Sequence, residues 1–334
     1  MNKTMQDPAV QEETLVFNFR FYASEEDDAS LAKVAQACME AADIDWIITT
    51  EDVRLRNAYL DNFDAQEDIL FVENAQGAIA FALVYWYKEM RGDVILRQLV
   101  RVLPEWRGYG IGEALLAWAE EHLLAKAVGE VDGNLYLSSS VVTSEEWRVE
   151  QLERRNYEPA RYFFEMVRPL NEPITHYPLP EGLEVRPVTA AHYQQIFQAS
   201  DEAFQDHWGH VPLTDNMIQQ WMESPEFQPE LWQVAWEGDQ VAGMVLNYIR
   251  QDENERFNRK RGYTEDISVR RPWRRRGLAT ALLARSLKML KGRGMHEANL
   301  GVDTENPSGA LQLYERLGYR SIRTMVNYRK IVSA

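Results

Sequence analysis

The chain carries the same glycine-rich turn twice, and such a turn is suited to holding a phosphate group. The two copies read WRGYGIGEALL at residues 106–116 and WRRRGLATALL at residues 273–283. Small residues let the backbone approach a ligand closely, and the first N–H groups of a helix have no partner within it. We therefore expect two anion-binding turns. Their predicted lining residues are Arg107, Gly108, Gly110 and Gly112 in the first copy and Arg274, Arg275, Arg276, Gly277, Ala279 and Thr280 in the second.

The two turns belong to a longer repeat. Trp106 aligns with Trp273 at an offset of 167 residues, and Tyr157 aligns with Tyr319 at an offset of 162. A nearly constant shift over a whole half indicates a duplicated domain rather than a short-period solenoid. A proline-rich segment separates the halves and is typical of a semi-rigid linker. We expect a disordered tail at 1–14, a first domain at 15–168, a linker at 169–182 and a second domain at 183–334.

Hydrophobic periodicity predicts the elements that position these turns. In the second half it predicts five strands and two helices after an opening helix at 190–203. Asn306 is expected to cap the last helix, with Pro307 at its first position. This order predicts an α/β class fold, with a mixed sheet and flanking helices, in each half. The predicted strands are 232–236, 241–249, 263–269, 297–303 and 319–332, and the helices are 277–291 and 307–317.

Composition limits the partners. The formal net charge of −16 disfavours nucleic acid and anionic membranes and favours cationic small molecules. Nine Lys and Arg residues lie at 256–276, where they are expected to crowd a nucleotide phosphate. The single Cys38 forms no internal disulfide, and no signal peptide or bilayer-length apolar run is visible. These features predict a cytoplasmic protein without membrane or nucleic-acid partners; they leave the oligomeric state open.

The motifs follow one another in an order known from one enzyme family. They are Ile267-Ser268-Val269, then Arg274-x-x-Gly277-x-Ala279, then Asn306-x-x-x-Ala310-x-x-x-Tyr314-x-x-x-Gly318-Tyr319; Val102 and Arg107-x-x-Gly110-x-Gly112 match in the first half. This pattern resembles the GNAT-type N-acetyltransferases over most of the chain. The tandem arrangement is similar in architecture to mycothiol synthase.

The resemblance implies an acetyl-CoA site in each intact domain. The pyrophosphate would lie on the turn, the acetyl arm along the strand that contains Ile267 and Val269, and Asn306 beside the coenzyme. The reaction would be direct transfer of the acetyl group to an amine. No metal is expected.

Two residues of the second half are candidates for proton transfer. Alternation along the strand places Glu265 on one face with Ile267 and Val269, and Asp266 on the other. Glu265 is the expected base that deprotonates the amine; the alternative is a solvated or ion-paired carboxylate. Tyr314 would donate a proton to the CoA thiolate, by the resemblance, although an aromatic on an apolar helix face is otherwise typical of a core residue.

The corresponding positions of the first half carry other residues. Glu265 aligns with Gln98, Tyr314 with Leu152 and Asn306 with Ser144. The first domain therefore keeps the turn, which leaves CoA binding open there, but lacks both proton-transfer groups, and we expect it to be catalytically degenerate. If the alignment slips by a residue, Tyr136 or Tyr157 could serve instead.

A further cluster, Asp206-His207-Trp208-Gly209-His210, follows the helix at 190–203. In the implied fold this segment forms a wall of the acceptor cleft, so Asp206, His207 and Trp208 are candidate substrate contacts. The alternative is a local hydrogen-bond network. Two His with this spacing lack the third ligand that a catalytic zinc site needs.

The sequence thus predicts a tandem N-acetyltransferase whose second domain uses acetyl-CoA and a small-molecule amine. The rival hypotheses are a non-catalytic acyl-CoA sensor and a transferase of a different acyl group.

Overall fold

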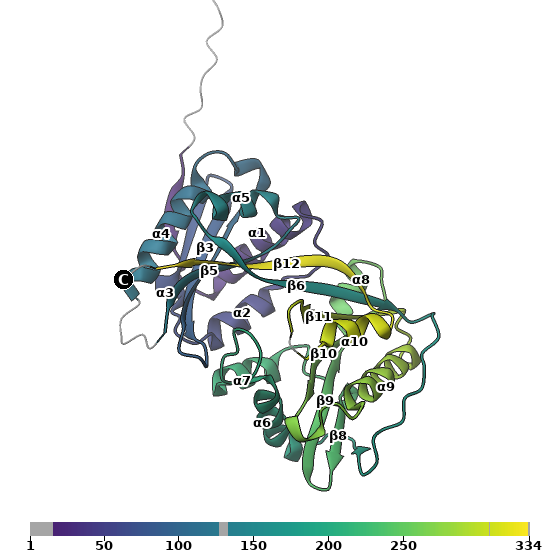
Figure 1. The fold of residues 1–334 in the computed structure, drawn as a ribbon. Coiled ribbons are helices and arrows are strands. Elements are labelled where there is room, and N and C mark those ends of the chain that lie inside the picture. Colours follow the sequence, from purple (N-terminus) through teal and green to yellow (C-terminus); the bar gives the residue numbers. More distant parts are fainter. Residues whose placement is uncertain (1–15, 127–132, 307, 333–334) are drawn as a thin grey trace, which may run out of the picture.

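The strands of the described residues form one twelve-stranded sheet with helices on both faces (Figure 1). The structure is a computed structural model that describes residues 16–126, 133–306 and 308–332. The expected tail at 1–14 and the predicted helix position of Pro307 lie outside the described residues. The strand order is β1-β2-β3-β4-β5-β12-β6-β11-β10-β9-β8-β7.

The first half contains six of these strands. A short 3-10 helix, Pro104–Trp106, joins β4 to α4 and contains the first copy of the repeated Trp. The elements are β1 (Asn18–Phe21), α1 (Asp28–Ala41), α2 (Thr50–Tyr59), α3 (Ala65–Asp68), β2 (Ile69–Asn74), β3 (Gly77–Lys88), β4 (Val94–Val102), α4 (Ile111–Lys126), β5 (Leu135–Val142), α5 (Glu146–Arg154) and β6 (Glu158–Pro169).

The second half repeats this order, with Arg271–Trp273 as the matching 3-10 helix. The strands and helices predicted for 190–332 are found within two residues of the expected bounds, except that two helices begin three residues late: α6 starts at Tyr193 after a 3-10 helix, Ala190–His192, and the last helix starts at Ala310. The cap is an exception: α10 begins at Ala310 after Gly309, and the Asn306 side chain accepts the Ser308 N–H (2.9 Å) in a turn that precedes the helix. The elements are β7 (Glu184–Val185), α6 (Tyr193–Phe204), α7 (Asp215–Glu223), β8 (Gln233–Glu237), β9 (Gln240–Tyr248), α8 (Gln251–Arg256), β10 (Arg261–Val269), α9 (Leu278–Gly292), β11 (Glu297–Asp303), α10 (Ala310–Arg316) and β12 (Arg320–Ile331).

The two halves exchange their last strands. β6 lies between β12 and β11, and β12 lies between β5 and β6. Figure 1 shows β12 running back into the first half while β6 runs toward the second, so that the two strands cross the junction side by side. The halves therefore share one continuous backbone ladder, and each half is completed by a strand of the other.

Apolar clusters fill both faces of the sheet. In the first half α4 covers one face and α1 the other; in the second half α9 and α6 do the same. Arg–carboxylate pairs occupy the junction: Glu165 on β6 contacts Arg261 and Arg323, and Asp45 contacts Arg259. The prediction that the whole basic stretch 256–276 crowds a phosphate site is therefore wrong for its first part, which binds the halves together.

Candidate active site

The two glycine-rich turns have the same backbone conformation. Gly108 and Gly110 have φ of 92° and 77°, and the matching Arg275 and Gly277 have φ of 60° and 84°. A side chain in this left-handed region costs about 1–2 kcal/mol, so Arg275 keeps a strained position. α4 and α9 begin directly after the turns, which leaves their first N–H groups free of intrahelical partners.

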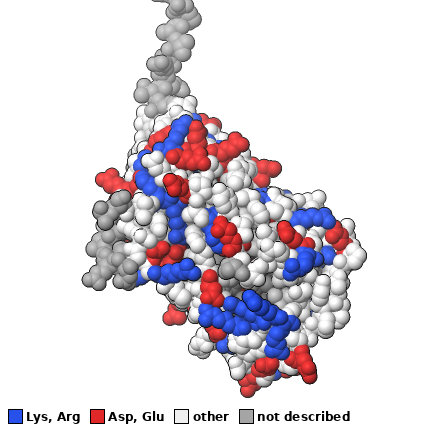
Figure 2. Space-filling model, in the orientation of Figure 1, with Lys and Arg blue, Asp and Glu red and all other residues white. Residues whose placement is uncertain are grey.

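Arginines gather at the second turn. In Figure 2 a group of Lys and Arg side chains lies in the region where Figure 1 shows the lower strands and the start of α9. Arg274 and Arg271 pair with Asp206 at 3.1 and 2.6 Å. Arg275 is exposed and makes no ion pair or hydrogen bond with the described part of the chain. It is therefore free to meet an anion, as a phosphate-binding turn requires.

A β-bulge interrupts β10 at the residues expected to do chemistry. Glu265 lies opposite Leu246 and Ser268 lies opposite Met244, so two residues of β10 face one residue of β9. Asp266 adopts φ 44° at the bulge. Ile267 packs toward α9, whereas Glu265 lines a cavity on the α6 face.

The predicted alternation is therefore wrong. Glu265 does not share a face with Ile267 and Val269, and Asp266 does not point away from Glu265: both carboxylates line the same cavity. The extra residue of the bulge shifts the alternation of side chains between the two faces of the sheet by one residue. Counting residues along the sequence cannot reveal this shift.

β10 and β11 separate at the bulge. Their parallel register runs from Arg261 opposite Glu297 to Tyr263 opposite Asn299 and stops there. Beyond it, the Glu265 side chain spans the gap and accepts the Gly301 N–H (3.0 Å). The pKa of Glu265 is raised to about 8, chiefly by burial and then by the charges of Glu226, Asp266 and Glu165, while the hydrogen bond from the Gly301 N–H opposes the shift.

The second carboxylate has a separate partner. Ser200 on α6 donates to both oxygens of Asp266, at 2.9 and 2.7 Å. Burial raises the pKa of Asp266 to about 6, while the hydroxyls of Ser200 and Ser268 hold it down. Two neighbouring carboxyl groups thus have pKa values close to neutrality, which suits groups that exchange protons with a substrate.

The cavity beside these carboxyl groups has a volume of about 250 Å³. Its wall is formed by α6, α7, β9 and the loop that follows α7. The lining residues are Phe197, Ser200, Leu213, Trp221, Glu226, Leu246, Tyr248, Glu265 and Asp266.

Tyr314 lies on the inner face of α10 and is 5% exposed. Burial raises the pKa of its hydroxyl, and the nearby charge of Glu265 raises it further. Its ring centroid lies 6.1 Å from that of Tyr319, whose hydroxyl hydrogen-bonds Thr264 (2.7 Å). The Tyr314 hydroxyl thus stays protonated at neutral pH, and it lies close enough to Glu265 for the charge of that residue to affect its pKa.

The first half has no bulge at the matching place, although its β4–β5 register also stops there, at Arg97 opposite Ser138. β3 and β4 pair without a register shift, from Ala80 opposite Val102 to Lys88 opposite Val94. Ser139 Oγ donates to the Gln98 carbonyl (3.1 Å), which holds β4 and β5 together. The space between these strands measures about 10 Å³, room for about one water molecule that the otherwise unpaired Gln98 amide can bind.

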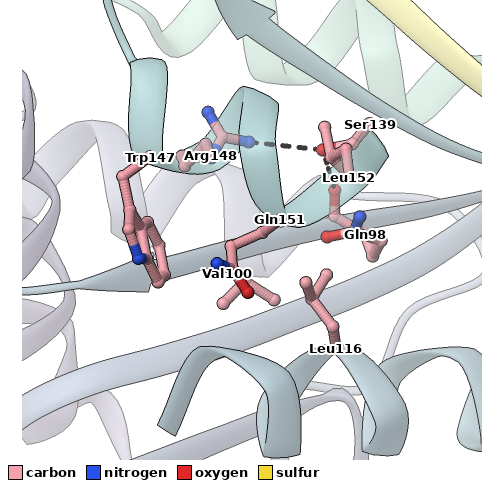
Figure 3. Close-up of a pocket in the computed structure, with 8 residues that line it drawn as sticks. All are labelled: Gln98, Val100, Leu116, Ser139, Trp147, Arg148, Gln151 and Leu152. Carbon is pink, nitrogen blue, oxygen red and sulfur yellow. Dashed lines mark hydrogen bonds between the residues drawn. The ribbon is translucent and has the colours of Figure 1, made fainter. Parts of the chain in front are cut away.

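Side chains of α5 fill this space. Figure 3 shows Trp147 and Gln151 reaching from α5 toward β4 and Arg148 bonding Ser139 of β5, with Leu116 of α4 beneath them. At the offset of 162 residues, Trp147 and Arg148 correspond to Gly309 and Ala310 of the second half. The first half therefore has two large side chains where the second half has almost none.

The comparisons with known proteins agree with this architecture. The sequence model of the acetyltransferase (GNAT) family matches residues 31–136 and 193–319, one match in each half. The chain belongs to the GNAT family of acetyltransferases. The predicted family and the predicted tandem GNAT fold are thus confirmed.

Curated relatives of this GNAT chain include mycothiol acetyltransferases. That of Streptomyces bingchenggensis is 30% identical over 170 residues, which cover 49% of this chain and 53% of the relative. That of Thermobifida fusca is 28% identical over 244 residues, which cover 70% and 73%. The match to the first relative thus spans about half of its length.

Solved structures share the tandem fold. A GCN5-related N-acetyltransferase from Sphaerobacter thermophilus has a TM-score of 0.70 at 26% identity and covers 95% of this chain and 96% of its own. A tandem GNAT protein from the clavulanic acid biosynthesis pathway has a TM-score of 0.68 at 14% identity, with 96% and 99% covered, and shows the shared fold.

The predicted substrate contacts of the GNAT chain lie outside the cavity. Asp206 is held by the arginines of the second turn. Trp208 packs against the exchanged strands, with its ring 4.1 Å from the Arg329 guanidinium carbon and 6.2 Å from the Phe163 ring. His207 contacts the Phe204 ring (4.5 Å), and burial lowers its pKa. A role for these three in acceptor binding stays a prediction that the cavity does not support.

Two features are absent from the residues that the structure describes. There, no group of three or more His, Cys, Asp or Glu side chains is arranged to hold a metal ion. Among the same residues, none of the helices is both long and apolar enough to cross a bilayer.

Sequence reasoning missed Asp266, Glu226, Trp221 and Tyr248 as lining residues of the cavity. Nothing in their spacing brings them together, because they come from β10, from α7 and its following loop, and from β9. The side chains that fill the groove of the first half did leave a signal in the sequence. Setting Trp147 against Gly309 at the offset of the repeat would have revealed it.

Proposed function

We propose that this protein is an N-acetyltransferase that transfers an acetyl group from acetyl-CoA to the amine of a small molecule, in its second half. The observation that carries the proposal is the bulge at Asp266. It follows the point where β10 parts from β11, and beside it Glu265 faces a cavity on the side of the sheet opposite α9.

The residues of the second turn fit the coenzyme. A diphosphate would meet the free N–H groups of α9 and the unpaired guanidinium of Arg275, while Arg274, Arg276, Gly277, Ala279 and Thr280 complete the turn. Bound acetyl-CoA would supply a thioester carbonyl for attack. The backbone of β10 from Ile267 to Val269 has no partner strand on the β11 side of the split, so it can pair with an extended arm.

Two side chains would move the protons. The amine arrives mostly as ammonium, and Glu265 would accept the proton that it must lose, directly or through water. As the nitrogen–carbon bond forms and the carbon–sulfur bond breaks, the Tyr314 hydroxyl would donate a proton to the departing thiolate, and the acetylated nitrogen would lose its second proton to solvent. The Tyr314 hydroxyl would then recover a proton from solvent, and Glu265 would release its own.

The first half would bind no coenzyme. Its turn has the cradle backbone, with Arg107, Gly108, Gly110 and Gly112, but Trp147 covers Gly112 and the strand that contains Val102 has no bulge. Glu113 also places a carboxylate in the first turn of α4, where α9 has Thr280. A carboxylate there occupies the position of an anion and repels a phosphate. These contacts favour a supporting role for the first half.

The test combines binding and turnover. Calorimetry should give one acetyl-CoA per chain, and a panel of small primary amines should yield free thiol and the acetylated amine. Binding without thiol release with any amine would favour the acyl-CoA sensor instead. A well-folded protein that binds no acetyl-CoA would contradict the proposal outright.

A further inference from the structure

We infer that the acceptor carries a second positive charge, and that the cavity beside Glu265 holds a short diamine with its far ammonium between Glu226 and the aromatic rings of Tyr248 and Trp221. This inference rests on the proposed function, because it names the substrate class of the same site. Three features of the cavity support it: its charge, its aromatic wall and its length.

The cavity is rich in carboxyl groups. Glu226, Glu265 and Asp266 line it, and none of the described residues that line it is cationic. Glu265 accepts a hydrogen bond from the Gly301 N–H and Asp266 accepts from the Ser200 hydroxyl, so neither is bonded by a cation. Carboxyl groups that are removed from water without a cation favour a ligand that supplies the charge.

The cation that pairs with Glu226 is already shared. Arg250 is buried and contacts Glu226 at 3.2 Å, Asp252 at 2.7 Å and Asp52 of the first half at 3.3 Å. One guanidinium among three carboxylates leaves this end of the cavity negative. Burial raises the pKa of Glu226, and the charge of Arg250 offsets this only in part.

The wall is aromatic where the far ammonium would lie. Phe197 and Trp221 lie with ring centroids 5.3 Å apart, and both line the cavity together with Tyr248. Aromatic faces attract a desolvated cation, and the same walls contact the methylene groups between two amines. A neutral polar acceptor would find few hydrogen-bond donors here.

The length of the cavity suits two charges. Leu246, opposite Glu265, and Tyr248 are two residues apart on one face of β9, which corresponds to about 6.6 Å along the strand. Glu226 pairs with Arg250, two residues past Tyr248 along the chain, so it lies at that far end. The volume of about 250 Å³ is at the lower limit for ligand sites and suits a short, unbranched molecule.

The experiment compares putrescine with aminobutanol, which has the same chain length and a neutral hydroxyl at its far end. Binding of both is measured by calorimetry in the presence of CoA, and acetylation by kcat/KM at saturating acetyl-CoA. We expect putrescine to be favoured at least about tenfold in both measurements. Equal affinity of the two probes would overturn the inference, whatever the rate of turnover.

Two matched variants locate the preference. Glu226→Gln should reduce the ratio of putrescine to aminobutanol about tenfold, because the amide keeps the shape but not the charge. Asp252→Asn removes the charge of another Arg250 partner that does not line the cavity, and it should leave the ratio unchanged. A ratio that both variants reduce equally would contradict a contact with Glu226.

The outcomes separate this inference from the proposed function. Thiol release with simple monoamines as fast as with putrescine would leave the transferase and remove the diamine preference. Preferential binding of putrescine without thiol release from acetyl-CoA would overturn the transferase and leave a diamine site.

Discussion

The indole of Trp147 lies against the α-carbon of Gly112, so that a β-carbon there would lie 2.6 Å from two of its ring carbons. Arg107 of the same turn stacks on the indole from 5.2 Å. The phosphate-type turn of the first half is therefore covered by a side chain of its own α5. The duplicated motif remains, but in this half it serves packing.

This contact predicts a position-specific loss of stability. Gly112→Ala should lower the free energy of unfolding by about 1–3 kcal/mol, because the new methyl group overpacks against a ring that α5 holds in place. Denaturant titration would measure it. In a Trp147→Leu background the cost should largely disappear, and an undiminished cost there would show that the indole is not its source.

The helix starts offer a matched pair of exchanges. Thr280→Glu should abolish acetyl-CoA binding, because it places a carboxylate where the phosphates would lie, while an acidic residue at a helix start leaves folding intact. Glu113→Thr, the reverse exchange in the first half, should leave both affinity and stoichiometry unchanged. Calorimetry measures both, and a second bound acetyl-CoA in Glu113→Thr would show that the first groove can open.

Glu265 should determine the pH dependence of catalysis. Its pKa of about 8 means that the carboxylate needed as a base is scarce at neutral pH and grows as the pH rises. The kcat/KM profile should therefore rise with an apparent pKa near 8. Glu265→Gln should reduce the rate by about two orders of magnitude and remove this limb. A variant that keeps the limb would assign it to another group, such as Asp266 or the amine itself.

The Glu265 carboxyl group should make the protein less stable as the pH rises, whereas a salt-bridged acid makes a protein more stable as the pH rises. Its native pKa lies above its value of about 4.3 in an unfolded chain, so the native state holds the proton more tightly. The contribution of Glu265 to the free energy of unfolding is fully present below about pH 4 and is lost as the pH rises through 8. The melting temperature of Glu265→Gln should therefore gain on that of the parent between pH 5 and 8. A constant difference over this range would argue against the raised pKa.

Tyr314→Phe separates proton donation from packing. The change removes one hydroxyl from a buried ring, so kcat should fall about tenfold or more while the affinity for acetyl-CoA stays nearly constant. Acyl donors with a better leaving thiol should recover part of the loss. An equal loss of affinity and rate would indicate that Tyr314 acts only in the core.

Several parts of the site follow from the amino-acid sequence alone. The turn residues, the helix that begins at Leu278 and the place of Tyr314 on the inner face of α10 follow from local periodicity and from glycine spacing, which depend on neighbours a few residues away. The exchange of β6 and β12 does not follow from the amino-acid sequence. The last strand of each half could pair with the equivalent edge in its own half or in the other half. The sequence of a strand does not specify which strand it pairs with.

The chain by itself determined a duplicated GNAT domain, the position of both turns and the loss of Glu265 and Tyr314 equivalents from the first copy. These depend on residue type and short-range spacing. The tertiary structure decided which strands complete each half, that Asp266 joins Glu265 in the cavity, and that Glu226 reaches the same space from a distant loop. One extra residue in a bulge and contacts between remote segments set those features, and both arise only when the strands pair and the helices pack.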